Sequence, residues 1–473
     1  MSELCFYALD VAQKTGASAC DVRFEEAFSG FLLFVNGSFE APAFSSWSGV
    51  GVRAFVHGFP SFSSTSRLDK ESVSAIAQRA TKYAKVFSQK SKPKSVTLPQ
   101  TNATFLVKEK KRVEEPDFDD LKETIKLAYQ ELKSSLKKAT LLQCFISVSW
   151  SKSHRTLVNS EGAYVNYTIP RVGEVAVFTL KRDDGLSLQK FHQREQEGGF
   201  ELFQAAKFVE SIKQQAIELE NVLFNGKQAD EGVTNIVLSP ELTGLVSHES
   251  VGHPLEADRV LGREGVQAGE SYASAQSIGV QIGAHNLNIS DDPTIERSNG
   301  YYLIDDEGVP AQKRRLIENG RINEFLLGLE PAAVLGLKSN GSSRCSSYDR
   351  EPIPRMSNTF FEPGDRTFDE LIEEAKEGVY FKSFREWNID DRRTNQRYVA
   401  LVAYKIKNGE VSEPLLMPVL EVTTFKLLSS FVGGSKDFEL YSGTCGKGDP
   451  GQPLPVSMGG PHTLFKGIKV GRR

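Results

Sequence analysis

The sequence predicts an α+β protein, with N-terminal α+β lobes built on mainly antiparallel sheets and a strand-rich C-terminal domain. Three observations predict this class. Residues 50–56 alternate apolar and other side chains with the period of a β-strand. Residues 71–86 carry an apolar stripe at helical spacing. Beyond residue 229, short apolar runs alternate with Gly-bearing turns.

The chain has 473 residues, which is too long for one ordinary core, so several domains are expected. Shifts in composition and periodicity set their boundaries, and the Lys/Ser/Pro-rich stretch after residue 89 is typical of a linker. The predicted divisions are an N-terminal α+β lobe (1–88), a linker (89–116), a second α+β lobe (117–228) and a strand-rich C-terminal domain (229–473).

Within the N-terminal lobes, the elements follow from local patterns. Residues 21–26 and 31–35 are predicted strands, the second ended by Asn36-Gly37. Apolar residues from Phe118 to Leu136 step by three and four, which predicts a helix. Residues 141–180 are predicted to form three or four antiparallel strands, and a long helix is predicted from about Glu201 to Phe224.

The C-terminal domain is predicted to begin with a buried strand that leads directly into a helix. The expected elements, in chain order, are a strand at 235–238, a break at Ser239-Pro240, a helix from Glu241 to about Gly252, a meander over 301–327, a helix at 368–377 and strands near 396–407 and 417–428.

Composition and charge exclude several classes of function. The formal net charge of −4 gives no electrostatic basis for nucleic-acid binding by the whole chain. No run of eighteen apolar residues occurs, so no membrane span is expected. The start of the sequence lacks a secretory signal, and the five scattered cysteines are typical of a reducing compartment. A cytoplasmic protein is therefore expected.

The most informative motif is His248-Glu249-Ser250-Val251-Gly252-His253, in which two imidazoles bracket a carboxylate. Such a set can hold a zinc ion and activate water. On an ideal α-helix, residues five apart point about 140° away from each other. Both histidines can reach one metal only if the helix widens or ends before His253. Gly252 and Pro254 favour this departure from α geometry.

A catalytic zinc site usually has three protein ligands and an open position, so a third ligand is expected. By sequence alone, Glu270, His285 and Cys445 compete, with Cys345 a weaker fourth. Residues 443–451 are Gly-rich and are predicted to form a loop that can bring the Cys445 thiolate close to another element.

Several of these stretches together resemble the TldD/PmbA metallopeptidases, and the similarity extends over nearly the whole chain. The H-E-x-x-x-H motif and the cysteine motif carry the resemblance most specifically. The matching stretches are residues 248–258, 305–310, 355–359, 444–447 and, near the N-terminus, 50–53.

The resemblance implies a metal-dependent peptidase in which two histidines and a distant cysteine bind zinc. Carried over to this sequence, the zinc ligands are His248, His253 and Cys445, and Glu249 is the general base. In this family, a TldD-type subunit with the motif often pairs with a TldE/PmbA-type subunit that lacks it. The present chain has the motif and so resembles the catalytic TldD-type subunit.

The predicted function is zinc-dependent hydrolysis of peptide bonds in extended or unfolded peptides, by a homodimer or by a heterodimer with a TldE/PmbA-like subunit. A thiolate ligand adds negative charge to the metal and predicts modest rates. One alternative is a non-enzymatic, zinc-containing regulatory protein, similar to a modulator of DNA gyrase, in which zinc is structural. Another is hydrolysis of amides other than peptides by the same apparatus. A membrane or nucleic-acid partner is not expected.

Overall fold

A computed structural model of the chain describes residues 2–89, 96–265 and 269–473. Helix accounts for 25% and strand for 42% of the structure, and most sheets are antiparallel, which confirms the predicted α+β class. Residues 90–95 of the predicted linker lie outside the described residues. Helices in the described part of the chain are all too short or too polar to span a bilayer.

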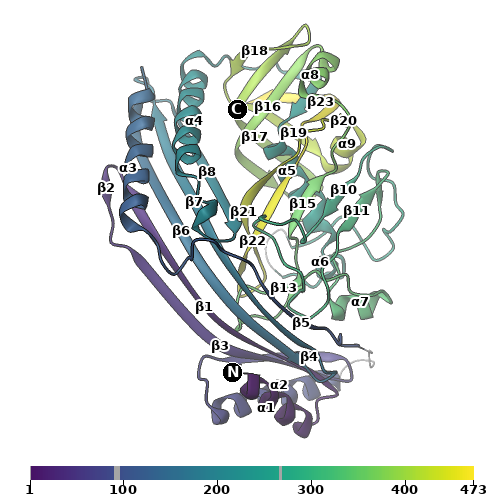
Figure 1. Ribbon diagram of the computed structural model, residues 1–473. Coiled ribbons are helices and arrows are strands. Elements are labelled where there is room, and N and C mark those ends of the chain that lie inside the picture. The colour runs from purple at the N-terminus through teal and green to yellow at the C-terminus, as the bar shows by residue number, and fades with distance from the viewer. Residues whose placement is uncertain (1, 90–95, 266–268) are drawn as a thin grey trace.

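A long, curved, eight-stranded sheet forms the N-terminal half of the molecule (Figure 1). The central order is β4-β3-β1-β6-β7-β5, with β2 added to β1 and β8 to β7. This single sheet joins strands from both predicted N-terminal lobes. Its strands are β1 (Ala19–Val35), β2 (Ser38–Phe39), β3 (Ala43–Val56), β4 (Phe59–Thr65), β5 (Asn102–Leu106), β6 (Thr140–Asn159), β7 (Tyr164–Lys181) and β8 (Ser187–Glu197).

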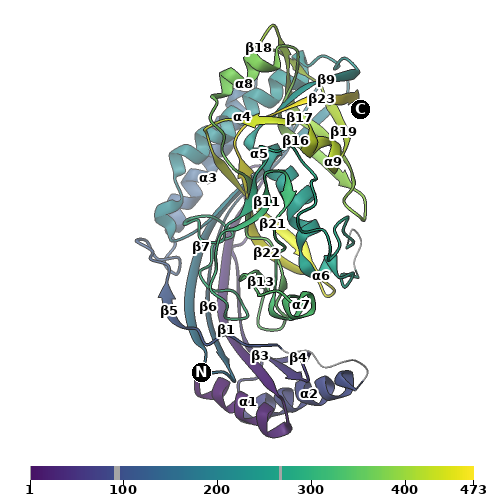
Figure 2. The ribbon, with the colours of Figure 1, turned by 90° about the vertical axis from the view of Figure 1, so that its right-hand side faces the viewer.

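Two pairs of helices pack at the two ends of this sheet (Figures 1 and 2). Asp69 and Asp117 cap the N-termini of α2 and α3 by accepting backbone N–H groups, as their sequence positions favour. The helices predicted over 71–86, 118–136 and 201–224 are confirmed. The observed bounds are α1 (Ser2–Thr15), α2 (Lys70–Ser88), α3 (Phe118–Ser135) and α4 (Ala205–Asn225), the last preceded by the 3-10 turn η1 (Phe200–Leu202).

The strand count predicted for residues 141–180 is wrong. The structure has two long strands there, β6 and β7, joined by a turn around Gly162, instead of three or four short ones. Likewise, the separate strands predicted at 21–26 and 31–35 are one strand, β1. No Gly-Pro or Asn-Gly pair interrupts these segments, so their alternating pattern continues across the full length of the sheet.

The described part of the C-terminal half contains two large sheets and one two-stranded sheet. In one, β16 pairs with both β9 and β17, so β16-β9-β23-β19-β17 close into a ring, with β18 and β20 attached outside. The strands are β9 (Gly232–Leu238), β16 (Gly378–Ile389), β17 (Asn395–Lys407), β18 (Glu410–Leu415), β19 (Pro418–Thr423), β20 (Phe431–Gly434) and β23 (Thr463–Arg472). Closing the ring removes edges that would otherwise lack partners.

The second C-terminal sheet has the order β12-β11-β10-β15-β22-β21 and lies beside the N-terminal sheet (Figure 2). Its strands are β10 (Ile289–Asp291), β11 (Arg314–Glu318), β12 (Arg321–Ile322), β15 (Asn358–Phe361), β21 (Glu439–Lys447) and β22 (Gln452–Gly460). A small hairpin, β13 (Ser343–Arg344) with β14 (Ile353–Pro354), stands apart from it.

Short helices complete this half: α5 (Pro240–Val246), η2 (Ser247–Gly252), η3 (His253–Leu255), α6 (Ala257–Val260), α7 (Leu329–Leu335), α8 (Phe368–Ala375) and α9 (Thr424–Ser429). The prediction of a strand over 417–428 is right only as far as Thr423, since α9 follows. The expected meander over 301–327 is reduced to the hairpin β11–β12, because residues 301–313 form turns and one isolated bridge.

Candidate metal centre

The metal motif follows directly from a buried strand, as predicted. β9 ends at Leu238, and Ser239 caps α5 by accepting the Leu242 N–H, with Pro240 in the first turn. All residues of α5 from Leu242 to Val246 are buried. The helix packs against β21 and β22, so the motif that follows it emerges inside the C-terminal core.

At Ser247 the α-helix widens into the π-helix η2, which carries the motif itself. The backbone N–H of His253 donates to the carbonyl of His248, the i→i+5 bond that defines a π turn. The wider turn brings the two imidazoles onto one side, with ring centroids 4.8 Å apart. The expected departure from α geometry is thereby confirmed. The 3-10 turn at Pro254 then ends the helix.

Gly252 is required by close packing within this turn. A Cβ placed at residue 252 would lie 1.9 Å from the Met356 Sδ atom. Met356 is buried in the same core that surrounds the motif. Any larger side chain at 252 must therefore displace Met356 or the turn.

The structure brings together His248, His253 and Cys445, which we call the donor group. Each offers one possible metal-ligating atom, and these three atoms all lie within 4.8 Å of one another. The Cys445 Sγ is 3.3 Å from His253 Nε2. All three side chains are buried. Among the described residues, this is the sole group of three or more His, Cys, Asp or Glu side chains placed to share a metal ion.

Cys445 lies on a strand, so the prediction of a Gly-rich loop over 443–451 is right only for the turn at residues 448–451. β21 continues to Lys447 and pairs antiparallel with β22, with Cys445 opposite Leu454. The glycines at 443 and 446 can adopt a strand conformation because pairing with β22 supplies their backbone hydrogen bonds. Their conformational freedom therefore does not produce a loop here. The strand holds the thiol more rigidly than a loop would.

The other candidates for a third ligand lie elsewhere. Glu270 is exposed and pairs with Arg392 at 3.3 Å, and His285 is exposed as well. Cys345 is buried on another face, where it accepts a hydrogen bond from Arg23. None of the three belongs to the donor group.

Glu256 supports the donor group from behind and was missed by the sequence reasoning. Its Oε2 lies 3.0 Å from His253 Nδ1, which leaves Nε2 directed at Cys445. A carboxylate that accepts from one ring nitrogen of a ligand histidine orients the other nitrogen toward a metal. Arg259, at 2.7 Å, and Lys447, at 3.1 Å, hold the same carboxylate oxygen. Glu256 follows the motif closely, but no spacing rule identifies it.

Electrostatics favour a charged thiolate at this position. Burial raises the pKa of the Cys445 thiol, but the positive charge of His253, His248 and Arg355 outweighs it and brings that pKa well below its usual range. Burial also raises the pKa of Glu256, yet Lys447 and the neighbouring histidine hold it well below normal. These neighbours favour the thiolate form of Cys445 and the carboxylate form of Glu256.

Glu249 projects from the same turn and is ion-paired with Arg393. Burial raises the pKa of Glu249, while His253, Arg393 and His248 together lower it below the ordinary value. Arg393 is buried and sits at a φ of 59° in the turn between β16 and β17. The sequence reasoning missed Arg393 because a charged turn some 140 residues away gives no signal of this contact.

The donor set fits a zinc ion. Zinc favours tetrahedral sets of imidazole and thiolate, which place a sulfur and a nitrogen ligand about 3.5 Å apart. The 3.3 Å separation of Cys445 Sγ from His253 Nε2 agrees with this value. His248 Nδ1 is buried without a hydrogen-bond partner, an otherwise costly arrangement that ligation of the same ring would help to explain.

Three sequence models of one family match the chain. They are the PmbA/TldA metallopeptidase domain 1 over residues 20–84, the central domain over 111–220 and the C-terminal domain over 231–472. Together they extend along most of the sequence, and the third includes the whole donor group.

Individual relatives agree with these matches. A metalloprotease of Methanocaldococcus jannaschii is 30% identical over 93% of this chain and 94% of its own length. A zinc metalloprotease TldD homolog of Saccharolobus solfataricus is 27% identical over 98% of this chain and 99% of its own. The crystal structure of TldE from Thermococcus kodakarensis has a TM-score of 0.75 at 19% identity, with 99% of this chain and 100% of that chain covered, which shows a shared fold.

Proposed function

The chain belongs to the PmbA/TldD metallopeptidase family, and from this premise we propose that it is a catalytic, TldD-type zinc peptidase of the H-E-x-x-x-H kind. His248, His253 and Cys445 would hold the zinc ion, and Glu249 would act as the general base. The proposed substrates are extended or unfolded peptides.

One observation carries this proposal: the donor group in the described part of the chain has three members rather than four. Structural zinc sites are closed by four protein ligands, whereas catalytic sites have three and keep a position for water or substrate. A set of two histidines and one cysteine therefore favours catalysis over the alternative of a regulatory protein with structural zinc.

When bound, zinc supplies Lewis acidity and makes water a better nucleophile at neutral pH. The chain's own residues do the rest in this proposal. Glu249 accepts the proton of the attacking water at its carboxylate and returns it to the leaving amine. Arg393 keeps that carboxylate oriented through its ion pair, and Glu256 keeps His253 in the ligating orientation.

The position of β21 supports an extended substrate. β21 ends the order of the six-stranded sheet, and it carries Cys445. A peptide that added to this edge as a further strand would pass the donor group and be recognised mainly through its backbone. Weak side-chain preference and exclusion of stably folded proteins follow from this binding mode.

A dimer is the proposed assembly, either of two copies or with a TldE/PmbA-like subunit. The fold shared with TldE supports a partner of that type. Light scattering on the purified chain, alone and mixed with a co-expressed TldE/PmbA-like subunit, separates the two cases.

The proposed site is tested by three substitutions, with zinc content and cleavage of an unfolded peptide as readouts. Glu249→Ala should keep zinc and lose about 10²–10⁴-fold in kcat, since proton transfer is its role. His253→Ala and Cys445→Ala should lose both zinc and activity. Cys345→Ala, a buried cysteine outside the donor group, is the matched control and should keep its zinc.

Full activity in Cys445→Ala would show that Cys445 is not a zinc ligand. Chelation gives an independent check on the alternative. Loss of fold on removal of zinc would favour a structural metal, whereas a retained fold with lost cleavage supports the enzyme.

A further inference from the structure

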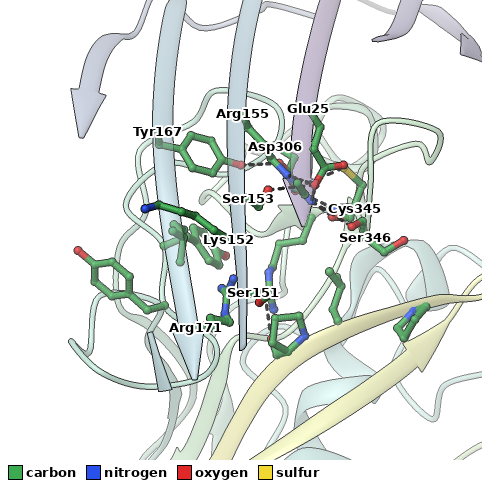
Figure 3. Close-up of a pocket in the computed structure, with 18 of the residues that line it drawn as sticks. Glu25, Ser151, Lys152, Ser153, Arg155, Tyr167, Arg171, Asp306, Cys345 and Ser346 are labelled. Atoms are coloured by element: carbon green, nitrogen blue, oxygen red, sulfur yellow. Dashed lines mark hydrogen bonds and ion pairs between the residues drawn. The ribbon is translucent and has the colours of Figure 1, made fainter. Parts of the chain in front are cut away.

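A cavity of about 290 Å³ lies between the curved N-terminal sheet and the C-terminal half (Figure 3). Strands β1, β6 and β7 form one wall, and the β21–β22 hairpin contributes to the other. Thr444 lines this cavity, while its neighbour Cys445 belongs to the donor group. Because successive side chains on a strand point to opposite faces, the cavity and the metal centre lie on opposite faces of β21. The proposed peptidase site therefore does not use it.

At one end of the cavity the charged groups pair with one another. The guanidinium of Arg155 pairs with Glu25 at 3.0 Å and with Asp306 at 2.9 Å. Asp306 also accepts from the Tyr167 hydroxyl at 3.0 Å and from the Cys345 N–H at 2.8 Å. Figure 3 shows these side chains gathered at the same end. Nothing at this end calls for a ligand.

The other end holds Arg171 and Arg344, and neither makes an ion pair within 4.0 Å in the described part of the chain. The Nε of Arg171 is buried without a hydrogen-bond partner. Arg344 is 6% exposed, and its two terminal nitrogens donate to the backbone carbonyls of Met356 and Pro455. Buried guanidinium groups are normally paired with an anion.

Burial is the main cause that lowers the pKa values of both arginines. Burial, Arg355 and Arg171 lower the pKa of Arg344 to about 10. Burial likewise lowers the pKa of Arg171. The charge of Glu195 raises that pKa, and the charge of Arg155 lowers it further. A bound anion would relieve both groups.

Among the described residues, nearby carboxyl groups do not pair with these arginines. Glu195 lines the same end, so two guanidinium groups face one carboxylate there. Burial raises the pKa of Asp305 well above normal and Glu307 adds to this, while three backbone N–H groups donate to the Asp305 carboxyl oxygens. Burial raises the pKa of Glu197, which lies opposite Arg171 on β8, to about 7. At this end of the cavity, Arg171 and Arg344 therefore have no carboxylate within ion-pairing distance in the described part of the chain, and a bound anion could pair with both.

Lys152 also lines the cavity, but its charge is paired with carboxylates that do not line it. It pairs with Glu114 at 2.7 Å and also with Glu109. In Figure 3 its side chain extends away from Ser151 and Arg171.

We propose that this cavity is a binding site for a small anion with a carboxylate or phosphate group, held by Arg171 and Arg344. Guanidinium groups bind both kinds of oxyanion through paired N–H donors. The Ser151 hydroxyl and the Tyr301 and Tyr302 rings line the remaining space. The volume limits the ligand to a small molecule.

Calorimetric titration of the purified full-length chain, in a buffer free of both anions, tests the proposal. The probes are inorganic phosphate and N-acetylalanine, which carries a carboxylate. N-acetylalanine amide, which has the same size but no charge, is the control. At least one anion should bind, and the amide should not. Binding by phosphate alone or by the carboxylate alone identifies which group the site selects.

Arg171→Met should weaken that binding at least tenfold. Arg112→Met removes an equal charge from an exposed arginine outside the cavity and should leave binding unchanged. A second measurement needs no variant: the bound anion should protect Arg171 from modification by phenylglyoxal, as read by mass spectrometry. Absence of binding by both anions, or equal binding by Arg171→Met, would overturn the proposal.

Discussion

Glu249 lies between the donor histidines and the guanidinium of Arg393, and this placement affects how well it can act as a base. The surrounding positive charge lowers its pKa, so the carboxylate is ionised but weakly basic. The same ion pair with Arg393 fixes the orientation of the Glu249 carboxylate. For a proton transfer within a positioned site, orientation contributes to the rate as well as basicity.

Arg393→Met should therefore lower kcat by about 10²-fold, since a misplaced carboxylate costs about that much. KM and zinc content should stay near those of the wild type, because Arg393 is not in the donor group. Steady-state kinetics and elemental analysis measure these quantities, and Arg393→Lys should recover part of kcat.

Arg392→Met is the matched control, since Arg392 adjoins Arg393 in the chain but is exposed and pairs with Glu270. Its kinetics should be unchanged. An unaltered kcat in Arg393→Met would contradict the proposal that Arg393 positions the Glu249 carboxylate.

Glu197 predicts a specific pH dependence of stability. Burial raises its folded pKa from 4.5 to about 7. Between those values the folded state holds a proton that the unfolded state has released, so this residue lowers stability as pH rises from about 4.5 to 7. In Glu197→Gln, the gain in melting temperature over the wild type should grow from pH 5 to pH 8. A constant difference over that range would contradict the raised pKa.

The π-helix is the element that makes a five-residue histidine spacing compatible with one metal. Its i→i+5 bond joins the two ligand candidates themselves, His248 and His253. π turns are less favourable than α turns and persist where packing supports them. Here α5 leads in from the buried strand β9, and Pro254 ends the widened turn.

Gly252→Ala should destabilise this element, because the new methyl would lie 1.9 Å from the Met356 Sδ atom. We expect a loss of about 1–3 kcal/mol in the free energy of unfolding, as for other overpacked cores. Zinc affinity should fall as the turn shifts. Chemical denaturation and zinc titration measure the two effects.

Gly446→Ala provides the comparison, because a Cβ there meets nothing within 4 Å although it adjoins Cys445. It should keep both its stability and its zinc affinity. Equal behaviour of the two variants would show that the turn tolerates a side chain.

At the scale of the whole molecule, buried charges hold the N-terminal sheet to the C-terminal half. Arg53 on β3 pairs with Asp21 on β1 and with Glu307, and Arg155 on β6 pairs with Glu25 and Asp306 in the same way. Such pairs fix the relative position of the halves because each charge is costly to bury alone.

Removal of one partner should therefore cost more than an exposed pair would. Arg155→Met leaves two buried carboxylates and should lower the free energy of unfolding by about 3–5 kcal/mol. Arg182→Met breaks an exposed pair with Asp184 and should cost less than about 1 kcal/mol. Urea denaturation of both variants makes the comparison, and equal losses would contradict the interface role.

Local patterns predicted much of the fold. The stripes over 71–86 and 118–136 specify helices because each buries one face, and the alternation over 50–56 specifies a strand. The strand count over 141–180 failed because length depends on how far the sheet extends. The domain boundaries drawn from composition stay a prediction, although one sheet joins strands from both N-terminal lobes.

The sequence by itself determined the α+β class, the metal motif and the need for a widened turn, since these depend on neighbouring residues and on backbone geometry. Only the tertiary structure decided which distant side chains meet. It brought Cys445 to the histidines on a strand rather than a loop, and it placed Arg393 against Glu249. In the described part of the chain it also left two arginines without an ion pair, in a cavity behind that strand. Such contacts arise from sheet order and register, which no local spacing encodes.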